Sequence, residues 1–568
     1  MKEDFKTFRI RFITVFVVLG ALIIFSKLYM VQIVRGESYS QQADRQYSRP
    51  NSQSFNRGSI SFTTKDGERI DAAGLKTGYT VAINPSQMSY PEDVYNGLSF
   101  LLELDEETFM KQANKSEDPY EEIAKQVPPN VAKKIDELDI EGVSLYKNKW
   151  RYYPGKSLGA HAVGFMSYRG DELRGQYGLE RYYNDILDRS EDDLYANFFV
   201  ELFSNIGDTI KGKSKAGSVV TTIEPSVQSF VEKELEHVLE KWNSDQAGAI
   251  VMNPNNGEIY AMALNPTFDL NDFGNVESGD VYRNDLVEGV YEMGSIVKAL
   301  TMAIGLDTGA VTANTTYNDK GSMTLNGSTF YNYDKKARGV VDMQAVLNNS
   351  LNTGVAFVVQ QVGNKKFSDY MKKLIGEETG IDLPNEASPL VKNLDTDRDI
   401  EHATASFGQG IAMSPIAITK ALAALGNGGY LVNPHIVKSI DYELGYERDV
   451  VPNDPVRIFS EKTSEEISRM LVRVVDEALG GGDVALPHHS IAAKTGTAQI
   501  ANSAGGGYYE DQFLHSFFGY FPAYEPEFIV FLYNVHPRGA EYASQTLTDP
   551  FMEIAKFLIN YYNVAPDR

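Results

Sequence analysis

Three short motifs, far apart in the chain, place the strongest constraint on the fold. They read SxxK at residues 295–298, SxN at 350–352 and KTGT at 494–497. Together they form the residue set of enzymes that attack a carbonyl carbon with a serine and move its proton with lysine instead of histidine. A fold in which the three motifs act together has to bring three distant segments to one cleft.

Each motif by itself carries little information. The chain also contains SFN at 54–56 and KTG at 76–78, and both fragments precede any SxxK. The order of the three motifs and the sequence around each of them therefore identify the site, because single short matches arise by chance.

The first motif predicts a nucleophile at a helix start. Ser295 follows a glycine and precedes an apolar run, 299–306, which predicts a buried helix. A helix that begins at the serine places Lys298 one turn later on the same face. Its N-terminus adds positive potential where an oxyanion develops. A buried lysine beside a second lysine has a depressed pKa and can accept the serine proton. The alternative is a serine cap on an ordinary core helix.

The second motif lies in a predicted turn between two apolar helical segments, 341–347 and 355–359. On such a turn Ser350 and Asn352 can face one cleft, where the serine relays a proton to a leaving amine and the asparagine binds a substrate amide. The alternative is a plain polar turn.

The third motif lies in a strand-like stretch, 491–500, that contains a glycine. Glycine in a strand often marks the close approach of another backbone. A peptide can lie antiparallel to this strand, with hydroxyls offered by Thr495 and Thr497 and a carboxylate bound by Lys494. The alternative is a bulge in a core strand.

The composition excludes several classes of protein. A net charge of −24 without a basic stripe argues against nucleic acid as a partner. The absence of cysteine excludes disulfides, thiolate metal sites and a cysteine nucleophile. The pair His488 and His489 lacks a spaced acidic or histidine partner, so a surface loop is favoured over a metal site. We expect neither a metal nor a cofactor.

The N-terminal segment predicts a membrane anchor. Basic residues at positions 2, 6, 9 and 11 precede an apolar stretch that runs, interrupted at 26–27, from 12 to 34. This length spans a bilayer, and no small-x-small cleavage pattern follows it, so a single-pass anchor is favoured over a cleaved signal peptide. The basic flank predicts a cytoplasmic tail, 1–11, and an extracytoplasmic remainder on the plasma (inner) membrane.

The rest of the chain is too long for one compact core, so two or more folded parts are expected. A Gly-, Ser- and Lys-rich boundary falls near 211–219. Before it, 35–217 mixes short strand-like and helical pieces, among them a strand at 79–84, a helix at 129–138 and an acidic, helical insert at 103–137. Beyond it, strand-like segments at both ends flank a helical middle, which predicts an α+β domain with one antiparallel sheet. The segments are 219–223, 247–252, 258–264, 515–521 and 527–535.

With the three motifs in one order, the sequence resembles the class B penicillin-binding proteins, which are peptidoglycan D,D-transpeptidases. YEMGSIVK at 291–298 resembles the family's aromatic-Glu-Pro-Gly-Ser-x-x-Lys, with Met293 in place of the usual proline. SFGQG at 406–410 and AKTGTAQ at 493–499 also match. Signatures of the family's pedestal match more loosely at 57–58, 66–67, 151–154 and 178–180, and SFTTK at 61–65 replaces its usual Asp-Arg pair.

The resemblance implies an α+β architecture in three parts. A single transmembrane helix at 12–34 precedes a mixed α/β, non-catalytic pedestal of the dimerisation type at 35–217. A transpeptidase domain at 218–568 follows, similar in fold to the serine β-lactamases.

The resemblance also implies catalytic roles. Ser295 is the nucleophile on a peptidyl-D-Ala-D-Ala donor, Lys298 takes its proton, and Ser350 helps to pass the proton to the departing D-Ala. Lys494 supports these steps electrostatically, and which lysine is the base is left open.

Substrate binding is implied for Asn352, Thr495, Gly496 and Thr497, which hold the peptide. The backbone N–H groups of Ser295 and Thr497 are implied to form the oxyanion hole.

The implied partners are peptidoglycan stem peptides, β-lactams, the membrane, a polytopic glycosyltransferase and divisome membrane proteins. SFGQG and HSFFG, at 406–410 and 515–519, favour the division or sporulation branch over the elongation branch. A β-lactamase or D,D-carboxypeptidase shares the three motifs, but no dedicated deacylating glutamate is identified. A membrane scaffold or β-lactam sensor is disfavoured by the intact motifs, and a bifunctional enzyme by the lack of an obvious glycosyltransferase domain.

Overall fold

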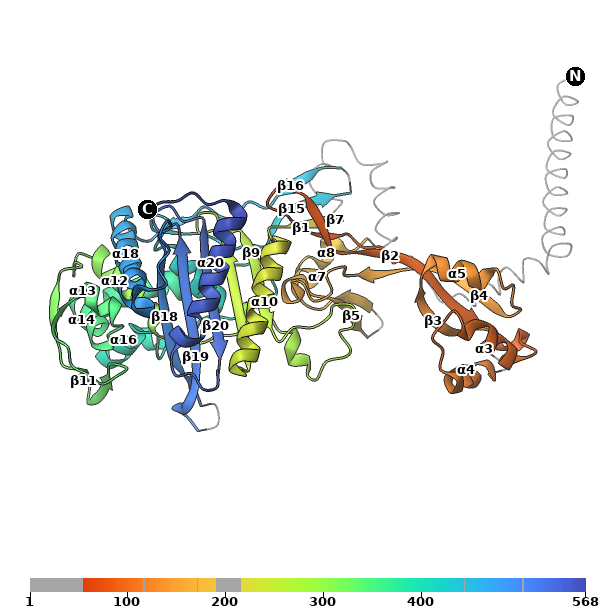
Figure 1. Ribbon diagram of the computed structural model, residues 1–568, viewed down its shortest axis with the longest axis horizontal. Helices are drawn as coiled ribbons and strands as arrows, with labels where there is room; N and C mark the ends of the chain where they lie inside the picture. The colour runs from red at the N-terminus through yellow and green to blue at the C-terminus, as the bar shows by residue number, and fades with distance from the viewer. Residues whose placement is uncertain (1–54, 116–117, 171, 190–215, 444, 503–504) are drawn as a thin grey trace, which may run out of the picture. The chain divides into compact units, whose positions relative to one another are not determined.

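The computed structural model describes residues 55–115, 118–170, 172–189, 216–443, 445–502 and 505–568 (Figure 1). The predicted tail and membrane anchor, 1–11 and 12–34, lie outside the described residues. Within those residues, no helix has both the length and the apolar character that crossing a bilayer requires.

The chain forms two compact units. The first is built around Leu75–Trp150, and the second contains Arg57–Gly74, Arg151–Arg189 and the described residues of 216–568. Two segments that the sequence places in the pedestal thus belong to the same compact unit as the three motifs. The predicted domain limits, 35–217 and 218–568, stay a prediction.

In the first unit, helices pack on a small antiparallel sheet around Val81, Leu98 and Phe109. The expected strand and helix are confirmed by β2 and α5, but the expected helical insert is wrong in part, because β3 lies inside it. Pairing with β2 satisfies the backbone of β3 despite its Glu- and Lys-rich sequence, so tertiary context overrides propensity. The elements are β2 (Arg69–Ile83), α3 (Pro91–Ser99), α4 (Glu106–Ala113), β3 (Glu121–Val127), α5 (Pro129–Asp136) and β4 (Val143–Tyr152). The start of β2, up to residue 74, and the end of β4, from residue 151, belong to the second unit.

The second unit is organised by a five-stranded antiparallel sheet in the order β18-β19-β20-β8-β9. Strands from both ends of the domain therefore meet, as the sequence predicts. In the turn between β8 and β9, Gly257 is left-handed, with a φ of +85°. The strands are β8 (Gln246–Met252), β9 (Ile259–Asn265), β18 (Ala492–Ala501), β19 (Tyr508–Phe521) and β20 (Phe528–Val535).

Helices cover both faces of this sheet (Figure 1). The alternation of strand side chains separates two apolar cores, so Phe517 packs with Phe551 of α20 while Phe518 belongs to the core that contains Leu300 of α12. α10 and α20 lie on one face. The helices are α10 (Pro225–Trp242), α12 (Val297–Asp307), α13 (Met343–Asn348), α14 (Asn352–Val362), α15 (Asn364–Ile375), α16 (Asp399–Ala405), α17 (Pro415–Ala423), α18 (Glu461–Arg473), α19 (Ala543–Thr546) and α20 (Thr548–Tyr562).

Shorter strands complete the second unit. β7 pairs in parallel with β1 and antiparallel with β15, which confirms the strand expected near 219–223. Two small ribbons, β10 with β13 and β11 with β12, lie beside the motif helices. The bounds are β1 (Ile60–Thr63), β7 (Gly217–Thr221), β10 (Thr316–Asp319), β11 (Ser322–Leu325), β12 (Ser328–Tyr331), β13 (Gly339–Asp342) and β15 (Val437–Tyr442).

Three of the pedestal signatures converge on one buried ion cluster in the second unit. Glu180, which is fully buried, accepts from the Nε of Arg57 at 2.7 Å and from the Nε of Arg151 at 2.5 Å. The Tyr153 hydroxyl donates to the same carboxylate at 3.2 Å. The signatures at 57–58, 151–154 and 178–180 are therefore parts of one structural feature.

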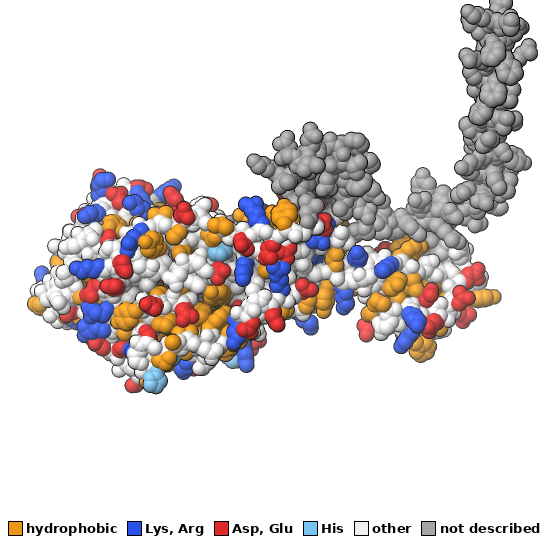
Figure 2. Space-filling view, turned by 90° about the horizontal axis from the view of Figure 1, so that it is seen from above, with side chains coloured by type: hydrophobic (Ala, Val, Ile, Leu, Met, Phe, Trp, Pro, Cys, Tyr) orange, Lys and Arg blue, Asp and Glu red, His pale blue; other side chains and the backbone are white. Residues whose placement is uncertain are grey.

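The surface carries charges of both signs. The face in Figure 2 shows acidic and basic side chains interspersed among apolar ones over the described residues. The net charge of −24 is thus not gathered into a single acidic patch on this face.

Candidate active site

The first motif begins a helix, as predicted. Ser295 lies in a 3-10 turn, Gly294–Ile296, that continues directly into α12. Gly294 has a φ of +63°, and a Cβ there would lie 2.7 Å from the carbonyl oxygen of Thr497. A glycine is needed because the turn packs directly against the backbone of β18. The first and third motifs are therefore in contact.

The second motif occupies the turn between α13 and α14, also as predicted. Ser350 is left-handed, with a φ of +52°, and its N–H donates to the carbonyl of Leu347 at 3.2 Å. Asn352 begins α14, and its Nδ2 donates to the carbonyl of Tyr331 at 2.8 Å. The turn is thus closed by a backbone hydrogen bond at Ser350 and tied to β12 by the side chain of Asn352.

Both motif lysines meet at the hydroxyl of Ser350. The Nζ of Lys298 lies 3.0 Å from the Ser350 Oγ and 2.5 Å from its carbonyl oxygen. The Nζ of Lys494 lies 3.1 Å from the same Oγ and 3.1 Å from the carbonyl oxygen of Thr495. The fold therefore joins all three motifs through one serine hydroxyl.

Burial changes the proton affinities of the two lysines. Lys298 is 1% exposed and Lys494 is 3% exposed. Desolvation, with a further contribution from the charge of Lys494, moves the pKa of Lys298 well below its ordinary value. Desolvation lowers the pKa of Lys494 to about 8. Near neutral pH, this order favours an unprotonated Lys298 beside a protonated Lys494.

The third motif lies on β18, which stands at the end of its sheet among the described strands. A Cβ on Gly496 would lie 2.7 Å from the carbonyl oxygen of Met293 and 2.3 Å from the Oγ of Ser516. The predicted close approach of another backbone is thereby confirmed. The hydroxyl of Thr497 accepts from the N–H of Ala543 in α19 at 3.1 Å.

A cavity of about 920 Å³ collects most of the predicted site residues. Lys298 and Gly496 do not line the cavity. Lys298 is connected to it through its contact with Ser350, which does line the cavity. The predicted residues on the wall are Ser295, Ser350, Asn352, Lys494, Thr495 and Thr497. An oxyanion hole formed by the N–H groups of Ser295 and Thr497 stays a prediction, although the contact of Gly294 with Thr497 brings their backbones together.

Sequence reasoning missed an aromatic wall of this cavity. The rings of Tyr333 and Tyr542 meet edge to face, with centroids 5.8 Å apart. Only Phe407, inside SFGQG, lies in a segment that the sequence singled out, because aromatic residues scattered over separate strands and loops share no periodic signal. The wall consists of Phe330, Tyr331, Tyr333, Phe407, Phe513 and Tyr542.

The segment SFGQG packs against the turn that carries Ser295. The N–H of Gly294 donates to the carbonyl of Gly408 at 3.2 Å. Glu292 accepts from the N–H of Gly410 at 3.0 Å and from the hydroxyl of Tyr508 at 2.9 Å. Burial raises the pKa of Glu292. Glu292 thus ties the turn that carries Ser295 to SFGQG and to the start of β19, a role the sequence did not reveal.

Comparisons with known proteins agree with this geometry. Residues 247–556 match the penicillin binding protein transpeptidase domain, and residues 56–192 match the penicillin-binding protein dimerisation domain. Stage V sporulation protein D of Bacillus subtilis is 30% identical over 96% of this chain and 84% of its own length.

A second relative is named probable peptidoglycan D,D-transpeptidase PenA, from Neisseria gonorrhoeae, at 27% identity over 78% of this chain and 74% of its own length. The crystal structure of penicillin binding protein 3 from Mycobacterium tuberculosis, complexed with aztreonam, shares the fold. It has a TM-score of 0.68 at 23% identity and covers 91% of this chain and 98% of its own. The chain therefore belongs to the class B penicillin-binding proteins, in which a dimerisation domain precedes a serine-type transpeptidase domain.

Proposed function

We propose that this protein cross-links peptidoglycan stem peptides through an acyl-enzyme on Ser295, formed from a D-Ala-D-Ala donor. The observation that carries this assignment is the convergence of Lys298 and Lys494 on the hydroxyl of Ser350, beside the turn that presents Ser295. Relatives of the chain are named peptidoglycan D,D-transpeptidases, and the family implies binding of peptidoglycan and β-lactams.

Acylation follows from the order of the lysine pKa values. Unprotonated Lys298 takes the proton of Ser295 as its Oγ attacks the carbonyl carbon of the penultimate D-Ala. The C–N bond of the terminal peptide then breaks, and the departing D-Ala amine receives the proton through the Ser350 hydroxyl. The positive charge of Lys494 and the backbone N–H groups of Ser295 and Thr497 stabilise the developing oxyanion.

Transfer to the acceptor reverses these steps. The amine of a second stem peptide loses a proton to Lys298 and attacks the ester carbon. The bond to the Ser295 Oγ breaks, the serine regains its proton, and a new amide joins the two peptides. The cavity of about 920 Å³ offers room for both peptides to approach the serine in turn.

The exposed side of β18 is the proposed seat of the donor peptide. A strand at the end of a sheet presents unpaired backbone groups, so an extended peptide can add to it as a further antiparallel strand. Thr495 and Thr497 flank this edge, Asn352 faces it across the cavity, and Lys494 attracts the donor carboxylate.

We further propose that the protein acts in division or sporulation, on the outer side of the plasma membrane. The similarity to a sporulation protein over 96% of the chain supports this branch. The apolar stretch 12–34 with its basic flank supports a single-pass anchor. Protease treatment of sealed membrane vesicles of known orientation tests the topology. When the outer side of the membrane faces the protease, only the first residues of the chain should be protected. A polytopic glycosyltransferase and divisome proteins are the partners proposed for a transpeptidase of this architecture.

Covalent labelling with a fluorescent penicillin tests the chemistry. We expect the full 568-residue chain to retain the label through denaturing electrophoresis, Ser295→Ala to lose it, and Lys76→Ala, at the upstream KTG, to keep it. Rapid loss of the label with release of penicilloate would show a β-lactamase instead. Absence of label on a folded wild-type chain would contradict the proposed acyl-enzyme. Release of D-Ala with formation of cross-linked dimer from stem-peptide substrates would separate a transpeptidase from a carboxypeptidase.

A further inference from the structure

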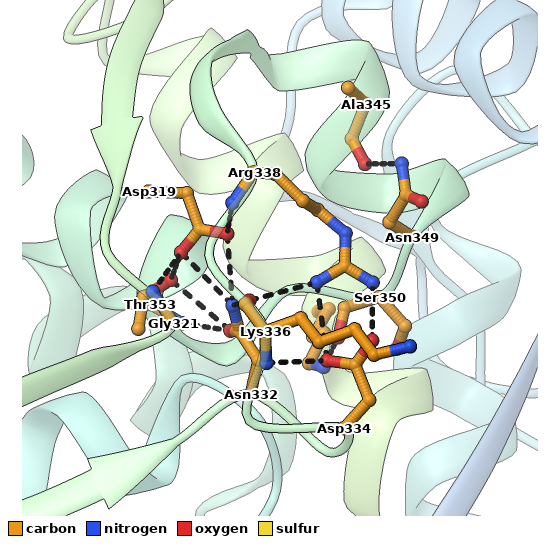
Figure 3. Close-up of polar contacts among 11 residues, drawn as sticks. Asp319, Gly321, Asn332, Asp334, Lys336, Arg338, Ala345, Asn349, Ser350 and Thr353 are labelled. Carbon is orange, nitrogen blue, oxygen red and sulfur yellow. Dashed lines mark hydrogen bonds and ion pairs between the residues drawn. The ribbon is translucent and has the colours of Figure 1, made fainter.

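The turn that carries Ser350 and Asn352 rests on a buried polar network centred on Asp319 (Figure 3). Asp319 ends β10 and is 1% exposed. Its carboxylate accepts from the backbone N–H groups of Gly321 and Arg338, each at 3.0 Å. These two bonds fix the segments on either side of the β11–β12 ribbon to the end of β10.

Two side chains complete the contacts of Asp319. The Nδ2 of Asn332 lies 3.0 Å and 3.1 Å from its two oxygens, and the Oγ1 of Thr353 lies 2.8 Å from Oδ1. Asn332 and Thr353 are each 1% exposed. All four partners donate, so the carboxylate acts purely as an acceptor.

Asn332 carries this network to the helix of the second motif. Its Oδ1 accepts from the backbone N–H of Thr353 at 3.2 Å. That N–H belongs to the first turn of α14, where Leu351 at the N-cap has no side-chain acceptor. A helix start needs such acceptors, and here a residue from another segment supplies one.

The neighbouring residue acts on Asn352 itself. The carbonyl of Tyr331 accepts from the Nδ2 of Asn352 at 2.8 Å. Tyr331 and Asn332 therefore hold two consecutive residues of the motif helix, Asn352 by its side chain and Thr353 by its backbone. The orientation of Asn352 in the cavity depends on where the segment after β12 is fixed.

Asp319 is the group that fixes this segment. In the described part of the chain no lysine or arginine side chain forms an ion pair with it, and the guanidinium of Arg338 binds Asp334 instead, at 2.9 Å. Neutral donors surround this buried carboxylate. If one of its acceptor oxygens is lost, the donors that it binds stay unpaired in a site without water, which costs free energy. Asp319, Asn332 and Thr353 do not line the cavity, so any effect on the reaction passes through Asn352 and Ser350.

We propose that Asp319 is a positioning residue for the acylation step. It orients Asn332 and Thr353, and through them the turn that presents Asn352 and Ser350 to the substrate. This assignment rests on the proposed function, since it presumes that Ser295 is acylated.

The variant Asp319→Asn tests this role in the full chain. In this variant the new amide NH2 would point at groups that now donate hydrogen bonds to the carboxylate, including the NH2 of Asn332. We expect the second-order rate constant of acylation by a fluorescent penicillin to fall by about 10-fold to 100-fold, the effect of a small misplacement in an active site. The double variant Asp319→Asn/Asn332→Asp restores a donor facing an acceptor, and it keeps an acceptor for the N–H of Thr353. We expect it to recover part of the lost rate, because the amide at position 319 still faces one of the backbone N–H groups of Gly321 and Arg338 with a donor.

A matched control separates positioning from stability. Asp382 is 7% exposed, accepts from the N–H groups of Ile436 and Val437, each at 2.8 Å, and does not line the cavity. Asp382→Asn removes a comparable buried acceptor, so it should lower the melting temperature and leave the acylation rate constant of the folded protein unchanged.

The outcomes distinguish the two levels of inference. If the wild-type chain is not acylated, the proposed function fails. If the wild type is acylated and Asp319→Asn reacts at the same rate, or if the double variant reacts no faster than the single one, the positioning role is overturned. Should Asp319→Asn not fold, Thr353→Val and Thr353→Ser decide. The valine variant should react more slowly and the serine variant, which keeps the hydroxyl, at the wild-type rate, whereas equal rates in both would overturn the proposal.

Discussion

The ammonium group of Lys494 donates to the hydroxyl of Ser350 across 3.1 Å, although 144 residues separate them in the chain. Lys298 approaches the same hydroxyl at 3.0 Å. Two ammonium groups at one buried acceptor repel each other, and both lose the solvation of water. Protonation of one of the two lysines therefore disfavours protonation of the other. The unprotonated lysine can then serve as a base near neutral pH.

The acylation rate should have an alkaline limb near pH 8. As the pH rises through the pKa of Lys494, which burial lowers to about 8, its positive charge is lost and the developing oxyanion is stabilised less. Lys494→Arg keeps its charge because guanidinium stays protonated in this range, so the limb should move to higher pH. Stopped-flow acylation between pH 6 and 10 measures both profiles, and identical limbs would contradict this role of Lys494.

Lys298→Met should abolish acylation without lowering stability. Burial and the charge of Lys494 depress the pKa of Lys298 in the folded state, so the unfolded chain binds more protons at neutral pH. Stability then rises with pH for this group, and at pH 7 the lysine destabilises the fold. We expect Lys298→Met to melt at or above the wild-type temperature at pH 7, with the difference shrinking toward pH 10.

Lys556→Met is the control for this variant, because Lys556 is about half exposed. The Lys556→Met protein should have the melting temperature of the wild type at every pH. A Lys298→Met protein clearly less stable than the wild type at pH 7 would count against the desolvation argument.

Gly408→Ala should slow acylation by displacing the nucleophile turn. Gly408 has a φ of +79°, and a Cβ there would lie 2.3 Å from the carbonyl oxygen of Gly294. We expect a loss of about 10-fold or more in the acylation rate constant. Gly309 is the matched control, with a φ of +68° and open space around its Cβ position.

Gly309→Ala adds backbone strain alone, of about 1–2 kcal/mol, and should leave acylation of the folded protein intact. Equal rates for the two alanine variants would show that the contact between Gly408 and Gly294 does not position the serine.

Glu180→Gln should destabilise the second unit. Burial alone would raise the pKa of Glu180, but the charges and hydrogen bonds of Arg151 and Arg57 outweigh it and lower the pKa. The cluster thus stabilises the fold above the ordinary carboxyl pKa and loses this contribution as the pH falls through the depressed one. Breaking a buried ion cluster costs about 3–5 kcal/mol.

Urea unfolding at pH 7 measures this loss of stability. Glu553→Gln is the reference variant, because the ion pair of Glu553 with Lys556 is about half exposed. Exposed ion pairs contribute about 0–1 kcal/mol to stability. A Glu180→Gln variant as stable as the reference would rule out a structural role for the cluster.

Local sequence was enough to predict the elements that carry the motifs. The apolar run after Ser295 became α12, the polar pair at Ser350 and Asn352 became a turn between helices, and the stretch around Gly496 became β18. These predictions hold because helix starts, turns and strands are governed by residues a few positions apart. The same reasoning failed for β3, because its Glu- and Lys-rich sequence becomes a strand only by pairing with β2.

The sequence by itself determined the chemistry available to this protein: two serines and two lysines that alternate along the chain, Ser295, Lys298, Ser350 and Lys494. The tertiary structure alone decided that both lysines meet at Ser350, that desolvation depresses their pKa values, and that Asp319 anchors the turn beside them. The reason is physical. Backbone conformation follows from neighbouring residues, whereas burial, charge proximity and the acceptor for a distant N–H exist only once segments far apart in the chain have packed together.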